Sequence, residues 1–171
     1  MKIGLMSDTH GYLDPAVKNY FSAVDEIWHA GDIGSINVLN ELKSFKPCVA
    51  VFGNIDHGEI IQQTNEFERF KREGVEVLMT HIAGKPGKYS KPIYEELSQN
   101  GAPKLFVCGH SHILLVKMDK RFNMLWMNPG ACGNHGFHKI KTLLRFEINK
   151  GKIEHLEVIE IGERGSTLKT S

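Results

Sequence analysis

Cysteine is scarce in this chain of 171 residues, which contains only Cys48, Cys108 and Cys132. These three are far apart, odd in number, and form no C-x-x-C pair. Such a pattern argues against a disulfide framework and against a thiolate zinc site. We therefore expect a protein of the reducing cytoplasm.

Long apolar runs are also missing. No stretch approaches the roughly 18 consecutive apolar residues that a membrane-spanning helix needs. The short apolar segment at residues 3–6 lacks the charged region and the cleavage site of a signal peptide. The sequence therefore predicts no membrane partner.

The chain has no excess of charge of one sign. Its 21 Lys and Arg residues offset 20 Asp and Glu residues, and the formal net charge is +1 with nine histidines counted as neutral. Binding to nucleic acid or to an anionic membrane usually relies on clustered positive charge. The balance argues against a nucleic-acid partner and is compatible with a small phosphorylated substrate.

Length and hydrophobic patterning predict one domain over residues 1–161 and a polar, flexible tail over residues 162–171. In the first half, expected strands alternate with helices that begin at Asp14-Pro15 and at Ser35. This alternation is typical of βαβ units and a parallel sheet. The expected strands of this half are residues 2–7, 26–30 and 47–52.

The second half is richer in expected strands. A helix over residues 93–99 follows an irregular loop over residues 84–92, which is rich in glycine and proline. The remaining patterns indicate hairpins and one buried strand. The expected strands are residues 66–71, 75–80, 105–108, 114–118, 124–127, 142–148 and 153–161.

Polar clusters follow the points where five of the expected strands end. In open α/β sheets, ligands bind at the carboxyl ends of the strands, so these five segments are expected to converge on one crevice. The clusters are Ser7-Asp8-Thr9-His10, His29-Ala30-Gly31-Asp32, Gly53-Asn54-Ile55-Asp56, Thr80-His81 and Gly109-His110-Ser111-His112.

The side chains in these clusters indicate a metal centre. Two carboxylates, four imidazoles and one amide suit Mn, Fe, Zn or Ni, whereas calcium and magnesium prefer oxygen ligands. Seven ligands are too many for one tetrahedral ion, and they suit two ions that share one carboxylate. His29 is expected to make a structural hydrogen bond instead. The seven are Asp8, His10, Asp32, Asn54, His81, His110 and His112.

In order and spacing, these motifs resemble those of the calcineurin-like metallophosphoesterase superfamily. The length is similar to that of its small single-domain bacterial and archaeal phosphodiesterases, and Asn128-Pro129-Gly130 resembles an element further along the family's chain. The resemblance implies an α/β fold, a four-layer α/β/β/α sandwich in which helices flank two mixed sheets. It also implies a hydrolase acting on phosphate esters, with a phosphodiesterase favoured over a phosphomonoesterase.

The same resemblance implies a role for each ligand. Asp8, His10, Asp32 and His112 would hold one divalent ion, and Asp32, Asn54, His81 and His110 the other, with Asp32 bridging. Mn²⁺ is expected ahead of Ni²⁺, Zn²⁺ or Fe. A hydroxide between the ions would attack phosphorus in line with the leaving group. The implied catalytic residues are Asp32, Asn54 and His110.

Three positions depart from the family pattern. Ile55 stands where many relatives carry a histidine that protonates the leaving group, Ile82 replaces a glycine and Ala131 replaces a serine. General acid catalysis contributes about 10²–10⁴-fold where it operates. We therefore expect that His57, His135 or a metal-bound water replaces the missing acid, or that the natural leaving group is a good one.

The sequence leaves the substrate open. The substrate-binding candidates are Asp56, His57, His135 and His138. A phosphomonoester dianion would need additional cations, for which the candidates are Arg69, Lys71, Lys85, Lys88 and Lys91.

Two other classes of protein compete with a small-molecule phosphoesterase. One is a non-catalytic, protein-binding scaffold on the same fold, like the retromer subunit. The intact set of seven ligand positions argues against it. The other is a nuclease, against which the balanced charge argues. A homo-oligomer also stays open.

Overall fold

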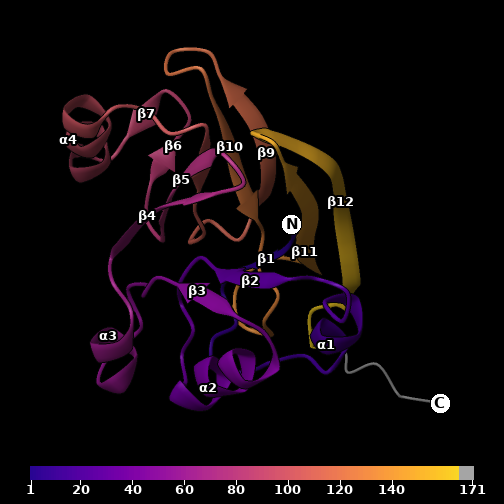
Figure 1. Ribbon diagram of the computed structural model, residues 1–171. Coiled ribbons are helices and arrows are strands. Elements are labelled where there is room, and N and C mark those ends of the chain that lie inside the picture. The colour runs from indigo at the N-terminus through magenta and orange to yellow at the C-terminus, as the bar shows by residue number, and fades with distance from the viewer. Residues whose placement is uncertain (166–171) are drawn as a thin grey trace.

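Two five-stranded sheets pack face to face at the centre of the fold, which the computed structural model describes over residues 1–165 (Figure 1). In the first sheet the order is β12-β11-β1-β2-β3. Strands β1, β2 and β3 are parallel, β11 is antiparallel to β1, and β12 is antiparallel to β11. These strands are β1 (Lys2–Met6), β2 (Glu26–His29), β3 (Cys48–Ala50), β11 (Ile140–Asn149) and β12 (Lys152–Glu163).

The second sheet has the order β4-β5-β8-β10-β9. Its three central strands, β5, β8 and β10, are parallel, and the edge strands β4 and β9 are antiparallel to their neighbours. These strands are β4 (Phe67–Arg72), β5 (Val75–Thr80), β8 (Leu105–Val107), β9 (Leu114–Asp119) and β10 (Met124–Pro129).

Helices cover the outer faces of both sheets. Figure 1 shows α1, α2 and α3 on one side of the pair of sheets and α4 on the other. Three buried apolar clusters separate the four layers, one beneath each helical layer and one between the sheets. The expected α/β/β/α sandwich is therefore confirmed. The helices are α1 (Ala16–Tyr20), α2 (Ile36–Phe45), α3 (Glu59–Gln63) and α4 (Lys91–Asn100).

The sequence explains these layers locally. In β1, Ile3 and Leu5 face the core between the sheets while Met6 faces the helical core, which is why this strand reads as a continuous apolar run. At α2, the Ser35 side chain accepts a hydrogen bond from the Asn37 N–H at 3.3 Å and caps the helix as expected.

Several boundaries differ from the expected ones. The first helix begins at Ala16, although the Asp14 carboxylate accepts the Ala16 N–H at 2.9 Å. The short helix α3 and the small hairpin of β6 (Gly84–Lys85) and β7 (Lys88–Tyr89) were not expected. Strand β12 continues through Gly162 and Glu163, the start of the predicted tail, whose residues 166–171 lie outside the described part of the chain. Within the described part, no helix is long and apolar enough to cross a membrane.

A buried ion pair ties the first helix to the first sheet. The Lys141 Nζ atom of β11 lies 2.6 Å from the Asp14 Oδ2 atom, and both side chains are fully buried. Removing one partner of such a pair leaves a buried charge without compensation, whereas exposed pairs contribute little.

We expect the Lys141→Met variant to lose about 3–5 kcal/mol of unfolding free energy, because the Asp14 carboxylate would stay buried without its cation. Urea denaturation measures this loss. The matched control is Lys18→Met, since Lys18 pairs with Glu41 at 2.7 Å with both side chains nearly half exposed. That control should change stability by less than about 1 kcal/mol. Similar losses in the two variants would contradict the assignment.

Candidate metal centre

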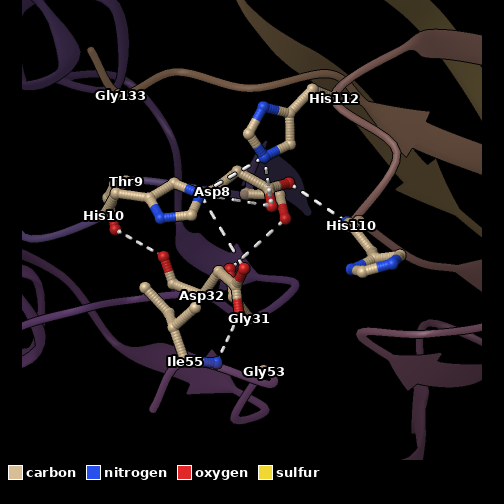
Figure 2. Close-up of polar contacts among 12 residues, drawn as sticks. Asp8, Thr9, His10, Gly31, Asp32, Gly53, Ile55, His110, His112 and Gly133 are labelled. Carbon is tan, nitrogen blue, oxygen red and sulfur yellow. Dashed lines mark hydrogen bonds and ion pairs between the residues drawn. The ribbon is translucent and has the colours of Figure 1, made fainter. Parts of the chain in front are cut away.

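Six of the seven predicted ligands form two clusters at the carboxyl ends of the central strands, and Figure 2 labels five of them, Asp8, His10, Asp32, His110 and His112. The first cluster consists of Asp8, His10 and His112, and the second of Asp32, His81 and His110. Within each cluster, one ligand atom from each residue lies within 4.8 Å of the others. The loops after β1, β2, β5 and β8 bring these residues together, as expected from the sequence.

Asp32 lies between the two clusters. Its Oδ1 atom is 3.2 Å from His81 Nε2 in the second cluster, and its Oδ2 atom is 3.7 Å from His10 Nε2 in the first. Within the first cluster, His112 Nε2 lies 3.2 Å from both Asp8 Oδ1 and His10 Nε2. Two oxygens directed at different clusters give Asp32 the geometry of a bridging ligand.

Asn54, the seventh predicted ligand, lies at the edge of the second cluster. It is exposed in the turn after β3 and lines a cavity of about 220 Å³ together with His81 and Ile82. Of the six clustered residues, His81 alone lines this cavity with Asn54.

The backbone of the centre is held in an unusual conformation. Five of the six clustered residues have positive φ angles: Asp8 at 58°, His10 at 48°, Asp32 at 53°, His110 at 67° and His112 at 57°. Non-glycine residues rarely adopt this region, and such strain persists where surrounding structure enforces it. Here the Asp8 N–H donates to the Gly31 carbonyl and the His10 N–H to the Asp32 carbonyl, both at 3.0 Å.

Two positions in the motifs require glycine because neighbouring side-chain atoms lie very close to their Cα atoms. A Cβ atom at Gly53 would lie 2.1 Å from Asp32 Oδ1, and one at Gly109 would lie 2.0 Å from the Ser7 Oγ atom. Any larger residue at either position would displace the loops that carry the ligands. The glycines therefore let the ligand carboxylates pack directly against a neighbouring backbone.

Buried polar atoms without hydrogen bonds show that the centre suits cations. Asp8 Oδ1 and His81 Nε2 are buried and have no hydrogen-bond partner. The His81 Nδ1–H donates to the Ala30 carbonyl at 2.7 Å, so the Nε2 lone pair of the neutral ring faces the two carboxylates. Metal-binding histidines are oriented in this way, and a cation would satisfy both orphaned atoms. The donor set therefore fits divalent ions.

The electrostatics agree with this fit. Burial lowers the pKa of His81, but its contacts with Asp32 and Asp8 raise it more, so the net pKa lies above the usual value. Burial raises the pKa of Asp32, but His81 and the Ile55 N–H lower it more, so this group stays a carboxylate. The two carboxylates thus attract positive charge, which either a proton on His81 or a bound cation would supply.

His29 braces the centre from behind, as the sequence predicted. The Gly31 N–H donates to His29 Nδ1 at 3.2 Å, so the His29 Nε2–H donates to Thr9 Oγ1 at 3.0 Å. The Thr9 hydroxyl in turn donates to the Ile33 carbonyl at 2.9 Å. Burial lowers the pKa of His29 to about 4, which keeps the ring neutral.

The Asp56 side chain forms hydrogen bonds with backbone N–H groups. Its carboxylate accepts the N–H groups of Ile33, Gly34 and Gly53 at 3.0, 2.7 and 2.8 Å. These bonds hold the loops after β2 and β3 together. The geometry therefore favours a positioning role for Asp56 over the substrate contact expected from the sequence.

Residues 133–138, which we call the rim loop, lie over the first cluster. The exposed His135 ring is 5.0 Å from the His10 ring, and the Phe137 ring is 5.6 Å from the His112 ring at an interplanar angle of 17°. The buried His138 ring packs edge-on against His112 at 5.3 Å. Sequence reasoning selected both histidines and missed Phe137, because no local pattern distinguishes a stacking aromatic from a solvated one.

His57 takes a different position. Its ring is exposed, and its Nδ1–H donates to the Ile55 carbonyl at 3.1 Å. The Ile55 N–H donates to Asp32 Oδ1 at 3.2 Å, so Ile55 supports the bridging carboxylate through its backbone (Figure 2). His57 is thus turned toward its own loop, whereas His135 contacts a predicted ligand.

Two of the basic residues named for a phosphomonoester, Arg69 and Lys71, lie elsewhere. Arg69 bonds Glu76, Glu96 and the Gly101 carbonyl. With Lys71 it lines a cavity of about 930 Å³ formed by the β4–β5 turn and the residues before β8, at the amino ends of the parallel strands. Over residues 1–165, the hydrogen bonds and ion pairs shown for the six clustered side chains involve no Lys or Arg.

Two carboxylate–imidazole clusters on a four-layer sandwich define a metal-binding centre, and comparison with known proteins identifies the family. The profile of the calcineurin-like phosphoesterase superfamily domain matches residues 1–151. The chain belongs to this family, whose members use divalent metals, and it is a metallophosphoesterase, a hydrolase that acts on phosphate ester bonds.

Curated relatives agree with this assignment. A probable metallophosphoesterase of Methanothermobacter thermautotrophicus is 31% identical over 136 residues, which cover 77% of each chain. A phosphodiesterase of Methanocaldococcus jannaschii is 26% identical over 149 residues, covering 77% of this chain and 84% of the relative.

Solved structures share the fold. An archaeal phosphodiesterase aligns with a TM-score of 0.73 at 22% identity over 94% of this chain and all of the other. Wild-type Vps29 of Entamoeba histolytica in complex with zinc aligns with a TM-score of 0.71 at 16% identity over 94% of this chain and 99% of the other. At these identities the likeness establishes the fold alone.

The buried, neutral His29 should make stability sensitive to acid. With an unfolded pKa of about 6.5 and a folded pKa of about 4, the unfolded chain binds more protons, so stability falls as pH drops through this window. Between pH 7 and pH 5 this group should remove about 2 kcal/mol of unfolding free energy. Urea denaturation of His29→Gln should show a correspondingly shallower pH dependence. Parallel curves for parent and variant would contradict this expectation.

His138 should position the ligand His112. The His138 Nε2–H donates to the Gly133 carbonyl at 3.0 Å, which leaves its Nδ1 as an acceptor, and the Nδ1 atoms of both rings are buried without a partner. With a metal on His112 Nε2 the ring would carry its proton on Nδ1, and His138 Nδ1 would accept that proton's hydrogen bond through one water.

Calorimetric titration with Mn²⁺ tests this role of His138. We expect His138→Phe, which keeps a ring but removes the acceptor, to weaken one binding step about 10–100-fold. His138→Asn should restore part of the affinity. If both variants bind Mn²⁺ like the parent, His138 does not position the ligand.

Proposed function

We propose that this protein hydrolyses phosphate diesters at a centre of two divalent metal ions held by the two clusters. The observation that carries the proposal is the position of Asp32, whose two carboxylate oxygens face different clusters at 3.2 and 3.7 Å. The orphaned Asp8 Oδ1 and His81 Nε2 atoms support it, because each lies where a cation would complete its bonding.

The seven predicted ligands would be shared between two metal ions. Asp8, His10, Asp32 and His112 would hold the first ion, and Asp32, Asn54, His81 and His110 would hold the second. When bound, the two ions lower the pKa of water and offset the negative charge that develops on the phosphoryl oxygens. His110 is exposed at the mouth and Asn54 lines the adjoining cavity, so both side chains are accessible to a phosphoryl oxygen.

Two further features refine the proposal. Imidazole-rich ligand sets suit Mn, Fe, Zn or Ni, and we expect Mn²⁺ to support activity. The lack of Lys or Arg contacts with the clustered side chains over residues 1–165 favours a diester monoanion over a monoester dianion. The substrate is then a small phosphate diester.

The missing general acid is best replaced by His135. Its exposed ring lies 5.0 Å from His10, whereas the His57 ring is turned to the Ile55 carbonyl. A histidine at the open side of the centre can donate a proton to a departing alkoxide. A good leaving group would make this proton unnecessary.

The alternative is a non-catalytic scaffold of the kind that the sequence left open. Vps29 proteins share the fold at 16% identity or less, which supports no functional transfer. The clustered ligands alone do not separate the two classes, because a Vps29 structure also contains zinc, so metal-dependent turnover decides between them.

The proposal is tested with chelator-treated protein and bis(p-nitrophenyl) phosphate, a diester whose leaving group needs no acid. We expect turnover only after Mn²⁺ is added, and two ions bound per chain by metal analysis. Asp32→Ala should reduce turnover to background and lower the metal content, because both clusters lose a ligand.

The matched control is Asp25→Ala, an exposed aspartate that accepts only the Lys2 N–H among the bonds shown. It should retain turnover and metal content. Absence of turnover with Mn²⁺, Ni²⁺, Zn²⁺ and Fe²⁺ in the parent would reject the hydrolase and favour the scaffold.

A further inference from the structure

The rim loop presents an unusually exposed aromatic ring beside the metal centre. The Phe137 side chain is 72% exposed, the highest value among the exposed large apolar residues. One face of its ring stacks on His112, so the other face is open to solvent. Leaving such a ring in water is unfavourable unless a ligand covers it.

Other exposed apolar side chains lie on the loops that carry the ligands. Ile113, which is 58% exposed, follows the ligand His112, and Ile82, which is 43% exposed, follows the ligand His81. Ile55 is 37% exposed and bonds Asp32 through its backbone. Isolated exposed apolar residues are ordinary, but four beside one set of ligands indicate a binding surface.

The rim loop is fastened in place. The Arg164 guanidinium donates to the Gly136 carbonyl, and the Gly165 N–H donates to Asn134 Oδ1 at 3.0 Å. At Gly136, where φ is 120°, a Cβ atom would lie 2.1 Å from His112 Nδ1, so the loop packs directly on the ligand. Phe137 is thus presented on a fixed backbone, which lowers the entropy lost when a ligand stacks on it.

We propose that Phe137 forms an aromatic subsite for one ester group of the diester, and that it selects substrates in which this group is planar and uncharged. The inference rests on the proposed function. An open ring face favours offset stacking with another ring, which contributes about 0.5–1.5 kcal/mol beyond apolar burial. The open face of Phe137 is itself apolar and uncharged, which favours an uncharged group.

The test uses two diester anions as inhibitors of bis(p-nitrophenyl) phosphate hydrolysis by the Mn²⁺-loaded protein. Diphenyl phosphate has rings to stack, and dimethyl phosphate has none. The parent should bind diphenyl phosphate more tightly. Phe137→Ala should reduce that preference about fivefold to tenfold while the affinity for dimethyl phosphate stays unchanged.

Three further variants separate stacking from other effects. Phe137→Tyr should keep the preference because it retains a planar ring, and Phe137→Leu should lose it. Val158→Ala, which removes apolar surface from a 50% exposed residue of β12, should behave like the parent.

The outcomes distinguish the two proposals. Equal weakening of both inhibitors in Phe137→Ala would show that the ring only supports His112, and would overturn the subsite. Diester hydrolysis with an unchanged preference would also overturn the subsite and leave the proposed function intact. If the parent does not hydrolyse bis(p-nitrophenyl) phosphate, and calorimetric titration shows that it binds neither inhibitor, both proposals fail.

Discussion

The close approach of two buried carboxylates is the constraint on which the rest of the centre depends. Asp8 and Asp32 follow neighbouring parallel strands, and both are nearly inaccessible to solvent. Burying two like charges is expensive unless hydrogen bonds and cations compensate them. The His110 N–H donates to Asp8 Oδ2 and the Ile55 N–H to Asp32 Oδ1, both at 3.2 Å, but Asp8 Oδ1 has no partner. The remaining negative charge makes the site selective for cations, and it explains why the pKa of His81 rises despite burial.

Side chains that never face the solvent hold this arrangement. Asp56 joins the loops after β2 and β3, His29 and Thr9 brace the loop after β1, and the Asn128 Nδ2–H₂ group donates to the Gly109 carbonyl at 2.7 Å. Each of these bonds connects segments that come from different strands. The apolar layers therefore fix where the strands end, and the buried polar residues fix how the ligand loops turn. A site that keeps five residues at positive φ needs the apolar layers and the buried polar residues together.

The different roles of the apolar layers and the buried polar residues explain how much of the structure the sequence could predict. Each ligand follows an apolar strand, so strand patterns and polar clusters together were enough to locate six clustered residues, whereas the four layers were implied by the family resemblance. The helix α3 was missed because five residues with one buried apolar side chain, Ile60, leave no periodic signal. Asp56 could not be distinguished from a substrate-binding residue, since a polar residue after a strand can serve either the substrate or the backbone. Phe137 stacks on a residue 25 positions earlier, and only the folded chain shows that contact.

The two sides of the centre differ in a way that bears on the substrate. The rings of the rim loop flank the first cluster, while the second cluster opens on a cavity of about 220 Å³ lined by Asn54 and Ile82. A phosphate diester carries two organic groups and one negative charge. A monoester carries one organic group and up to two charges, and it gains most from cationic side chains. The proposed preference for a diester rests on these two different sides and on the hydrogen bonds and ion pairs of the clustered side chains over residues 1–165, none of which involves Lys or Arg.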